Sequence, residues 1–139
     1  MNLVVDTNVV IAGLRSRKGA SFEIVSAMLQ NHLGFLISVP LFLEYEEVMK
    51  RKEPDLLPHL SNVEKDVILN GFAAFGKQPR IFYLWRPFLR DPDDDMLVEL
   101  AVAGSASHIV TSNMNDFDGV ETLGITVSTP QKFYRINFL

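Results

Sequence analysis

The sequence predicts an α/β fold with three layers in the order α/β/α and a central, mostly parallel five-stranded sheet. The chain has 139 residues, 47% hydrophobic and 22% charged, which suits a single globular domain over residues 1–139. Short β-rich runs alternate with longer runs of helical spacing, in the order β-α-β-α-α-β-α-β-β-α. Strands that alternate with helices imply a parallel sheet covered on both faces.

The expected strands are short apolar or β-rich runs that lie between turn or helix signals. We place them at 3–5, 34–38, 79–84, 108–111 and 125–127. The clearest expected helix follows the Ser-Asn-Val-Glu capping box at 61–64 and continues to about residue 75. Among the other expected helices, one is capped by Ser21, one has Pro40 in its first turn, and two open at Asp91-Pro92 and Thr129-Pro130.

Composition excludes several kinds of site. The chain has no cysteine, which excludes thiol catalysis, thiolate zinc sites and disulfides. A net charge of −4 does not suit bulk electrostatic binding of nucleic acid, so such a contact must be local or bridged by cations. Asp6 interrupts the apolar start, and no window reaches the ~18 apolar residues of a membrane span. We therefore expect a cytoplasmic protein that does not contact membranes.

Acidic residues fall where the strands of the sheet should end. They are Asp6 after the first strand, Glu44 early in the helix after the second, Asp93–Asp95 before the fourth, and Asp116, with Asn113, after the fourth. Ligands of parallel α/β sheets bind beyond the carboxyl ends of the strands, near the point where the strand order reverses. These side chains are therefore expected to converge on one rim.

Convergent carboxylates repel one another, and a divalent cation relieves the repulsion. Mg²⁺ and Mn²⁺ take oxygen ligands, keep several waters and also bind phosphate oxygens, so the pattern favours phosphoryl chemistry. Taken singly, Glu44 suits an exposed helix residue, Asp116 a turn residue, and Asp93 and Asp95 solvated acids of a first helical turn. The joint placement carries the hypothesis.

Three stretches, in order, resemble the four motifs of PIN domains. Asp6-Thr7-Asn8-Val9-Val10 resembles the opening motif, 38–51 the second motif and 91–117 the third and fourth. The resemblance spans nearly the whole chain and is closest to the VapC-like ribonucleases, which are toxins of toxin–antitoxin pairs. It implies hydrolysis of RNA phosphodiester bonds by a water activated by Mg²⁺ or Mn²⁺. It also implies a small antitoxin partner and a homodimer.

The resemblance assigns catalytic and metal-binding acids to Asp6, Glu44, Asp94 and Asp116. Asp94, with Asp95 as runner-up, stands seven residues before Ala101, the spacing of the family's acid and helix alanine. Asn113 stands where many members carry Asp, so Asp116 is expected to substitute. Substrate or water positioning is expected of Thr7, Asn8, Thr111, Ser112 and Asn113, with the first two holding the Asp6 carboxylate.

Other functions stay open at this point. The chain could be a housekeeping PIN nuclease rather than a toxin, or a catalytically weak PIN-fold interaction module, which Asn113 leaves open. A phosphoacceptor fold with Asp6 as nucleophile is disfavoured, because Asn8 stands where its second Asp belongs and Ser128-Thr129-Pro130, instead of a lysine, directly follows the last strand.

Overall fold

The sheet contains four parallel strands in the part of the chain that the computed structural model describes, residues 1–81, 89 and 91–139. They are β1 (Asn2–Val5), β2 (Gly34–Phe35), β3 (His108–Val110) and β4 (Thr126–Ser128). Their order is β2-β1-β3-β4, so the first strand of the chain lies in the centre. The predicted α/β class with a parallel sheet is confirmed.

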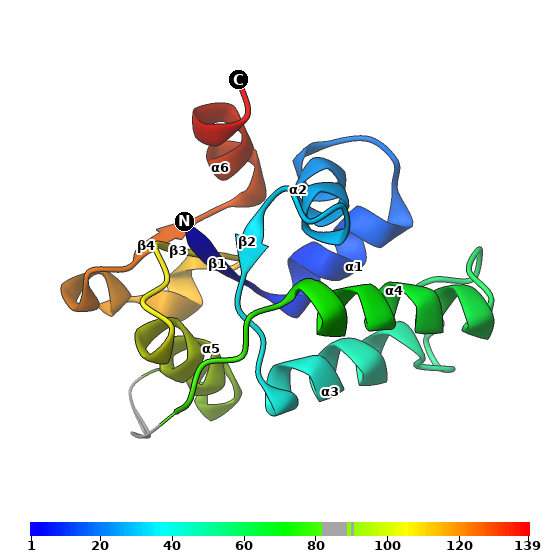
Figure 1. The fold of residues 1–139 in the computed structure, drawn as a ribbon, viewed down its shortest axis with the longest axis horizontal. Helices are drawn as coiled ribbons and strands as arrows, with labels where there is room; N and C mark the ends of the chain where they lie inside the picture. The colour runs from blue at the N-terminus through cyan, green and yellow to red at the C-terminus, as the bar shows by residue number, and fades with distance from the viewer. Residues whose placement is uncertain (82–88, 90) are drawn as a thin grey trace.

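Helices cover both faces of this sheet. They are α1 (Thr7–Arg15), α2 (Ala20–Leu29), α3 (Val39–Met49), α4 (Asn62–Phe75), α5 (Pro92–Ala103) and α6 (Pro130–Asn137), with two 3-10 turns, η1 (Met114–Phe117) and η2 (Val120–Leu123). Figure 1 shows α2 and α6 on one side of the strands and α5 on the other. The three-layer arrangement is therefore confirmed. Helices α3 and α4 pack side by side next to this unit.

The central strands end at the same level. Val5 of β1 is in register with Val110 of β3, which in turn pairs with Ser128 of β4. The Asp6 amide donates to the Val110 carbonyl at 2.9 Å, and the Thr111 amide donates to the Ser128 carbonyl at 2.9 Å. Because the chain continues to β2 on one side and to β4 on the other, the strand order reverses between β1 and β3. Residues that follow these two strands face the crevice where such folds bind ligands.

Several expected helix ends are confirmed by their caps. The Ser61 hydroxyl accepts the Glu64 amide at 3.1 Å, and the Glu64 carboxylate accepts the Ser61 amide at 3.0 Å, which completes the capping box of α4. The Thr129 hydroxyl accepts the Lys132 amide at the start of α6. Helix α5 begins at Pro92, as expected.

The expectations around the first two strands need correction. Helix α1 was not expected, and it begins directly after Asp6. Ser21 does not cap a helix, because α2 already begins at Ala20 after Gly19, whose φ of 101° suits glycine. The strand expected at 34–38 ends at Phe35. Ser38 instead caps α3, where its hydroxyl accepts the Leu41 amide at 3.2 Å.

The strand expected at 79–84 falls mostly outside the described residues. Residues 79–81 are described, and they are not part of a strand. The nearest pairing is an isolated parallel bridge between Leu36 and Lys77. It places the segment after α4 beside the edge of the sheet at β2.

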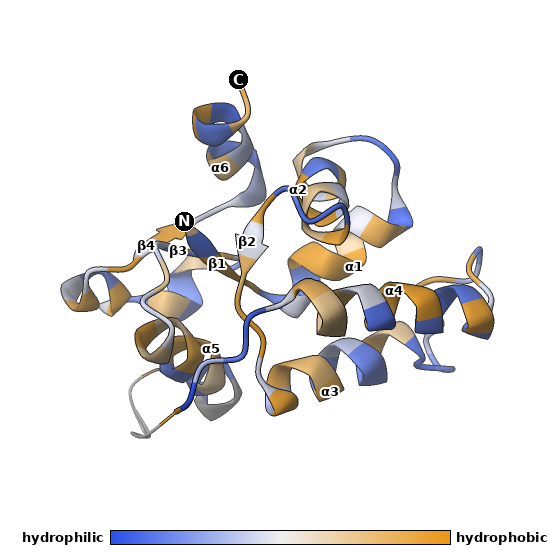
Figure 2. Ribbon diagram, viewed as in Figure 1, coloured by the Kyte–Doolittle hydropathy of each residue, from blue (hydrophilic) through white to orange (hydrophobic). Residues whose placement is uncertain are grey.

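Hydrophobic residues fill the interior, and some of them remain on the surface. Leu3, Val4 and Val5 of the central strand are fully buried. Figure 2 shows hydrophobic and hydrophilic residues alternating along α3 and α4. The exposed large hydrophobic side chains of these two helices are Val39, Leu43, Val63, Val67 and Phe75. No helix in the described ranges is long and apolar enough to cross a membrane.

Candidate active site

The acidic residues converge on one cavity of about 480 Å³ at the carboxyl end of the sheet. Seven of the nine residues predicted from the sequence line it: Asp6, Thr7, Asn8, Glu44, Asp94, Asn113 and Asp116. Asp91 also lines this cavity, and the other described residues of its wall are Ile11, Ala12, Arg15, Val48 and Leu56. The predicted convergence at one rim is therefore what the structure shows. We call this space the acidic cavity.

Asp6 is held at the centre of the cavity wall by hydrogen bonds to one carboxylate oxygen. The Thr111 hydroxyl donates to Oδ2 at 2.8 Å, and the Asn8 side-chain amide donates to the same oxygen at 3.3 Å. Asp6 is only 8% exposed, and Thr111 behind it is fully buried. Thr111 therefore contacts the carboxylate from within the protein and does not line the cavity.

Glu44 reaches the same cavity from α3 and is held by α1. The Thr7 hydroxyl donates to Glu44 Oε1. Thr7 was expected to hold Asp6, and only its backbone amide does so. Its hydrogen bond to the Asp6 carboxylate partly opposes the rise in pKa that burial causes. The hydroxyl instead links the first turn of α1 to α3. This link fixes Glu44 relative to the end of β1.

The two neighbouring acids at the start of α5 face in different directions. Asp94 is half-buried and lines the acidic cavity. Asp95 is fully buried, and its Oδ1 accepts the Leu89 amide at 2.7 Å. Asp95 is therefore not the solvated acid that its position suggested. This arrangement favours the choice of Asp94 over its neighbour, because an inward carboxylate that binds the backbone cannot also face the cavity.

The segment after β3 forms another wall of the cavity. The Asn113 amide donates to the Thr111 hydroxyl at 3.1 Å, and the Ser112 amide donates to Asn8 Oδ1 at 3.2 Å. Asn113 and Asp116 are exposed and line the cavity, whereas Ser112 lines an adjoining depression that shares Asn113 and Asp116 with it. Asn8 therefore joins the Asp6 carboxylate to this segment.

Tyr45 is a site residue that the sequence reasoning missed. It is fully buried in α3, and its hydroxyl donates to the Val5 carbonyl at 2.5 Å. The carbonyl of Leu3, two residues earlier, accepts the Leu36 amide, but β2 ends before it could reach Val5. Tyr45 therefore satisfies the last acceptor of this strand edge and holds α3 beside Asp6. The i, i+4, i+8 spacing of Leu41, Tyr45 and Met49, all fully buried, is the sequence signal that could have identified it as inward-facing.

Burial and neighbouring carboxylates raise the pKa values of Asp6 and Asp94. Burial and the charges of Asp6, Asp91, Asp116 and Glu44 raise the pKa of Asp94 to about 7. Burial also raises the pKa of Asp6, with Glu44 and Asp116 adding to the effect and the Thr111 hydrogen bond opposing it. The pKa of the Tyr45 hydroxyl lies well above its usual value, because burial and the charges of Asp6 and Glu44 disfavour its ionised form. A cation in the cavity would relieve this repulsion.

The arrangement is open rather than a finished metal cage. Within the described ranges, no three acidic or histidine side chains are grouped closely enough to hold a metal ion by themselves.

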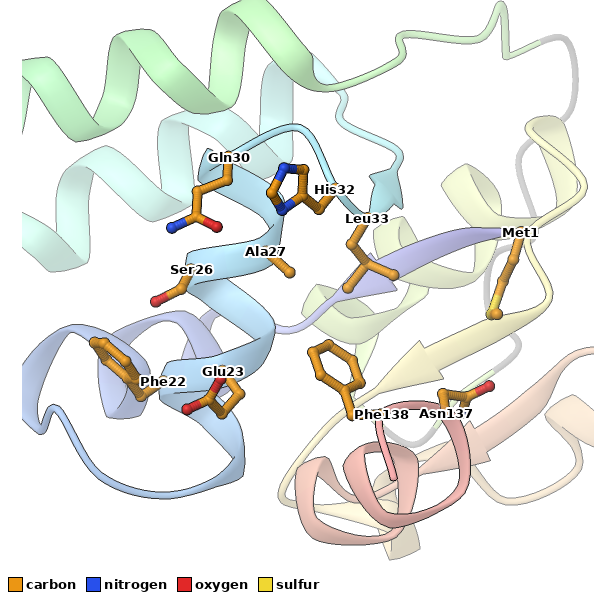
Figure 3. A pocket seen from close by; sticks show the side chains of 10 residues that line it. All are labelled: Met1, Phe22, Glu23, Ser26, Ala27, Gln30, His32, Leu33, Asn137 and Phe138. Carbon is orange, nitrogen blue, oxygen red and sulfur yellow. The ribbon is translucent and has the colours of Figure 1, made fainter.

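A second cavity, of about 520 Å³, lies between α2, the residues after it and the end of α6 (Figure 3). Glu23 and His32 are the titratable side chains among its described lining residues. The acidic cavity is therefore the stronger candidate for phosphoryl chemistry.

The comparison with protein families agrees with this geometry. A family model described as PIN domain matches residues 2–115, well over half of the chain. The chain therefore belongs to the PIN-domain family, whose members are typically nucleases. The match includes Asp6, Glu44, Asp94 and Asn113, and it ends one residue before Asp116. The chain has no significant match to a curated protein or to a solved structure.

We predict that replacing Asp94 by Asn stabilises the metal-free protein at alkaline pH. The pKa of Asp94 is about 7 in the folded protein, against 3.8 for an unperturbed aspartate. The folded state therefore binds the proton more tightly than the unfolded state does. The contribution of this proton to the free energy of unfolding is complete below about pH 4 and is lost as pH rises through 7. At pH 8 with chelator, Asp94→Asn should raise the melting temperature by roughly 2–4 °C, a modest shift because solvent screens this half-buried group.

Thermal unfolding at pH 4 and pH 8 gives the measurement. Asp118→Asn is the control, because Asp118 is exposed and is not among the described residues that line the cavity. The control should leave the melting temperature within about 1 °C at both pH values. If Asp94→Asn shifted the melting temperature equally at pH 4 and pH 8, that result would contradict a raised pKa of Asp94.

Proposed function

We propose that this protein is a metal-dependent endoribonuclease and the toxin of a toxin–antitoxin pair. The observation that carries the proposal is the convergence of Asp6, Glu44, Asp94 and Asp116 on one cavity. Membership of a family that is typically composed of nucleases supports the reaction class. An RNA substrate would place the activity in the cytoplasm.

The cavity fits Mg²⁺ or Mn²⁺ by the chemistry of its donors. Its acidic side chains offer oxygen ligands, and the raised pKa of Asp94 reflects burial together with the charges of neighbouring carboxylates, which a cation would offset. Mg²⁺ keeps several waters and usually binds through one or two carboxylates together with substrate phosphate, so a ready-made set of three ligands is not required. Asp6, Glu44 and Asp94 would hold the ion, and Asp116, on the segment after β3, would complete the set.

The bound cation would supply an acidified water as nucleophile and would neutralise charge on the phosphate. The residues of the chain prepare the site for this chemistry. Thr111 and Asn8 fix the Asp6 carboxylate, and Thr7 fixes Glu44. A carboxylate held this way loses less freedom when it takes a ligand. Asn113 and Asp116, which line the cavity from the segment after β3, would orient water or substrate.

The surface of α3 and α4 supports a protein partner. Val39 and Leu43 are 58% and 52% exposed on α3, and Val63 and Val67 are 73% and 65% exposed on α4. Each of these two packed helices therefore exposes apolar side chains that a protein partner would cover. A small antitoxin and a second copy of the chain, as expected for a homodimer, are the partners that we propose for this surface.

We predict that RNA cleavage requires Mg²⁺ or Mn²⁺ and is lost in Asp6→Asn. This substitution leaves the hydrogen-bonded position filled but removes the charge that a cation needs. The rate on single-stranded RNA should fall by at least about 10²-fold, the scale seen when metal-site electrostatics are removed. Gel analysis of cleaved RNA, with circular dichroism to verify folding, gives the measurement.

Asp118→Asn serves as the matched control, since it removes an exposed carboxylate that is not among the described residues lining the cavity. It should cleave RNA at the wild-type rate. Undiminished cleavage by the wild type in excess chelator would refute a metal-dependent mechanism. A folded wild type that cleaves no RNA with either metal would favour the interaction module instead.

The toxin role predicts an effect on cells. Induced expression of the wild type should arrest growth in a bacterial host, and co-expression of the small reading frame that adjoins the gene should relieve the arrest. Asp6→Asn, expressed to the same level, should not arrest growth because it lacks nuclease activity. Growth curves and viable counts give the measurement. An active nuclease whose expression leaves growth unchanged would instead point to a housekeeping role.

A further inference from the structure

The acidic cavity extends along α1 beyond its carboxylates. Asn8, Ala12 and Arg15 recur at helical spacing on one face of α1, and all three line the cavity. Thr7, beside Asp6, and Arg15 are separated by about 12 Å along the helix axis, from the rise of 1.5 Å per residue. The cavity therefore has an acidic end near β1 and a second end near Arg15.

The walls of the second end have a different chemistry. Ile11 and Ala12 come from α1, Val48 lies one helical turn after Glu44 on α3, and Leu56 comes from the loop between α3 and α4. These four side chains are apolar. Arg15 is the cationic side chain among the described residues that line the cavity. The carboxylates are thus followed along α1 by an apolar wall and then by one positive charge.

Core packing explains part of this wall and leaves the rest unexplained. Ile11 is buried, and Val48 and Leu56 are partly buried against the core. Ala12 and Arg15, however, are exposed. A basic residue in the last turn of a helix interacts favourably with the helix dipole, but that interaction does not require an apolar, concave surface beside it.

A polymeric substrate supplies groups that match this order. A phosphodiester at the carboxylates is covalently joined to a ribose and a base on each side, and then to the next phosphates. The face of a base or ribose packs on an apolar wall, and arginine binds phosphate through parallel hydrogen bonds. The volume of about 480 Å³ leaves room beside the acids for more than one phosphate group.

We propose that the wall of Ile11, Ala12, Val48 and Leu56 binds the nucleoside next to the scissile phosphate, and that Arg15 binds the neighbouring phosphate. This inference rests on the proposed ribonuclease activity and adds a subsite to it. Arg15 and the wall act in substrate binding, away from the reacting atoms. Their loss should therefore raise KM and leave kcat nearly unchanged.

The first test compares Arg15→Gln with Arg17→Gln. Both variants remove one exposed arginine near the end of α1, and Arg17 is not among the described residues that line the cavity. With a fluorescently labelled single-stranded RNA of mixed sequence and Mg²⁺, Arg15→Gln should raise KM about fivefold at unchanged kcat. The salt dependence of log(kcat/KM) should become shallower by about 0.7, the value for one phosphate contact on a single strand. Arg17→Gln should change neither.

The second test blocks the apolar wall with a larger side chain and leaves its buried residues unchanged. Ala12→Glu introduces a bulky negative group at an exposed position of α1, so folding should be retained. Ala74→Glu is the matched control, because Ala74 is an exposed residue of α4 and is not among the described residues that line the cavity. Ala12→Glu should raise KM at least as strongly as Arg15→Gln, while Ala74→Glu should match the wild type.

The outcomes separate the two proposals. A wild type that cleaves no RNA with Mg²⁺ or Mn²⁺ would overturn the ribonuclease and the subsite together. An active wild type in which the two arginine variants behave alike, or in which Ala12→Glu matches Ala74→Glu, would overturn the subsite alone. A fall in kcat at constant KM in Arg15→Gln would also overturn it, because that pattern belongs to chemistry rather than to substrate binding.

Discussion

The hydrogen bond between Thr111 and Asp6 joins the two strands on which the whole site depends. It connects the first residue after β3 to the first residue after β1, at the point where the strand order reverses. A carboxylate that is 8% exposed needs donors, and the buried hydroxyl and the Asn8 amide supply them. These hydrogen bonds fix the position of the Asp6 carboxylate, and the other acids lie around it.

The remaining acids come from helices and a 3-10 turn that lie around the same cavity. Strand β2 is too short to pair with the end of β1, and α3 lies there instead. The Tyr45 hydroxyl of α3 donates to the Val5 carbonyl at that edge of β1. Glu44, the neighbour of Tyr45, then meets Thr7 at the start of α1. Burial, together with the charges of these neighbouring carboxylates, raises the pKa of Asp94 to about 7. The fold thus concentrates negative charge that a divalent cation would stabilise, as the proposed function requires.

The positions of the acids relative to the strands were predictable, because the ends of parallel strands share one edge and the pattern of elements indicated such a sheet. Helix α1 was not predictable in this way, because its run of β-branched residues has low helix propensity. In the folded protein, burial of Val9 and Val10 outweighs that preference. Ser38 extended a strand-like run, and only its hydrogen bond identifies it as a cap. Sequence spacing could favour Asp94 over Asp95, but the inward rotation of Asp95 depends on the Leu89 amide, a tertiary contact.

The most direct test of the carboxylate site is calorimetric titration of the wild type with Mn²⁺ at pH 7, in two buffers that differ in ionisation enthalpy. Metal binding requires deprotonated ligands, so a carboxyl with a pKa of about 7 should release about half a proton per chain when the ion binds. The account predicts saturable binding with this proton release, and a smaller release in Asp94→Asn. Absence of binding, or binding with the same heat in both buffers, would contradict it.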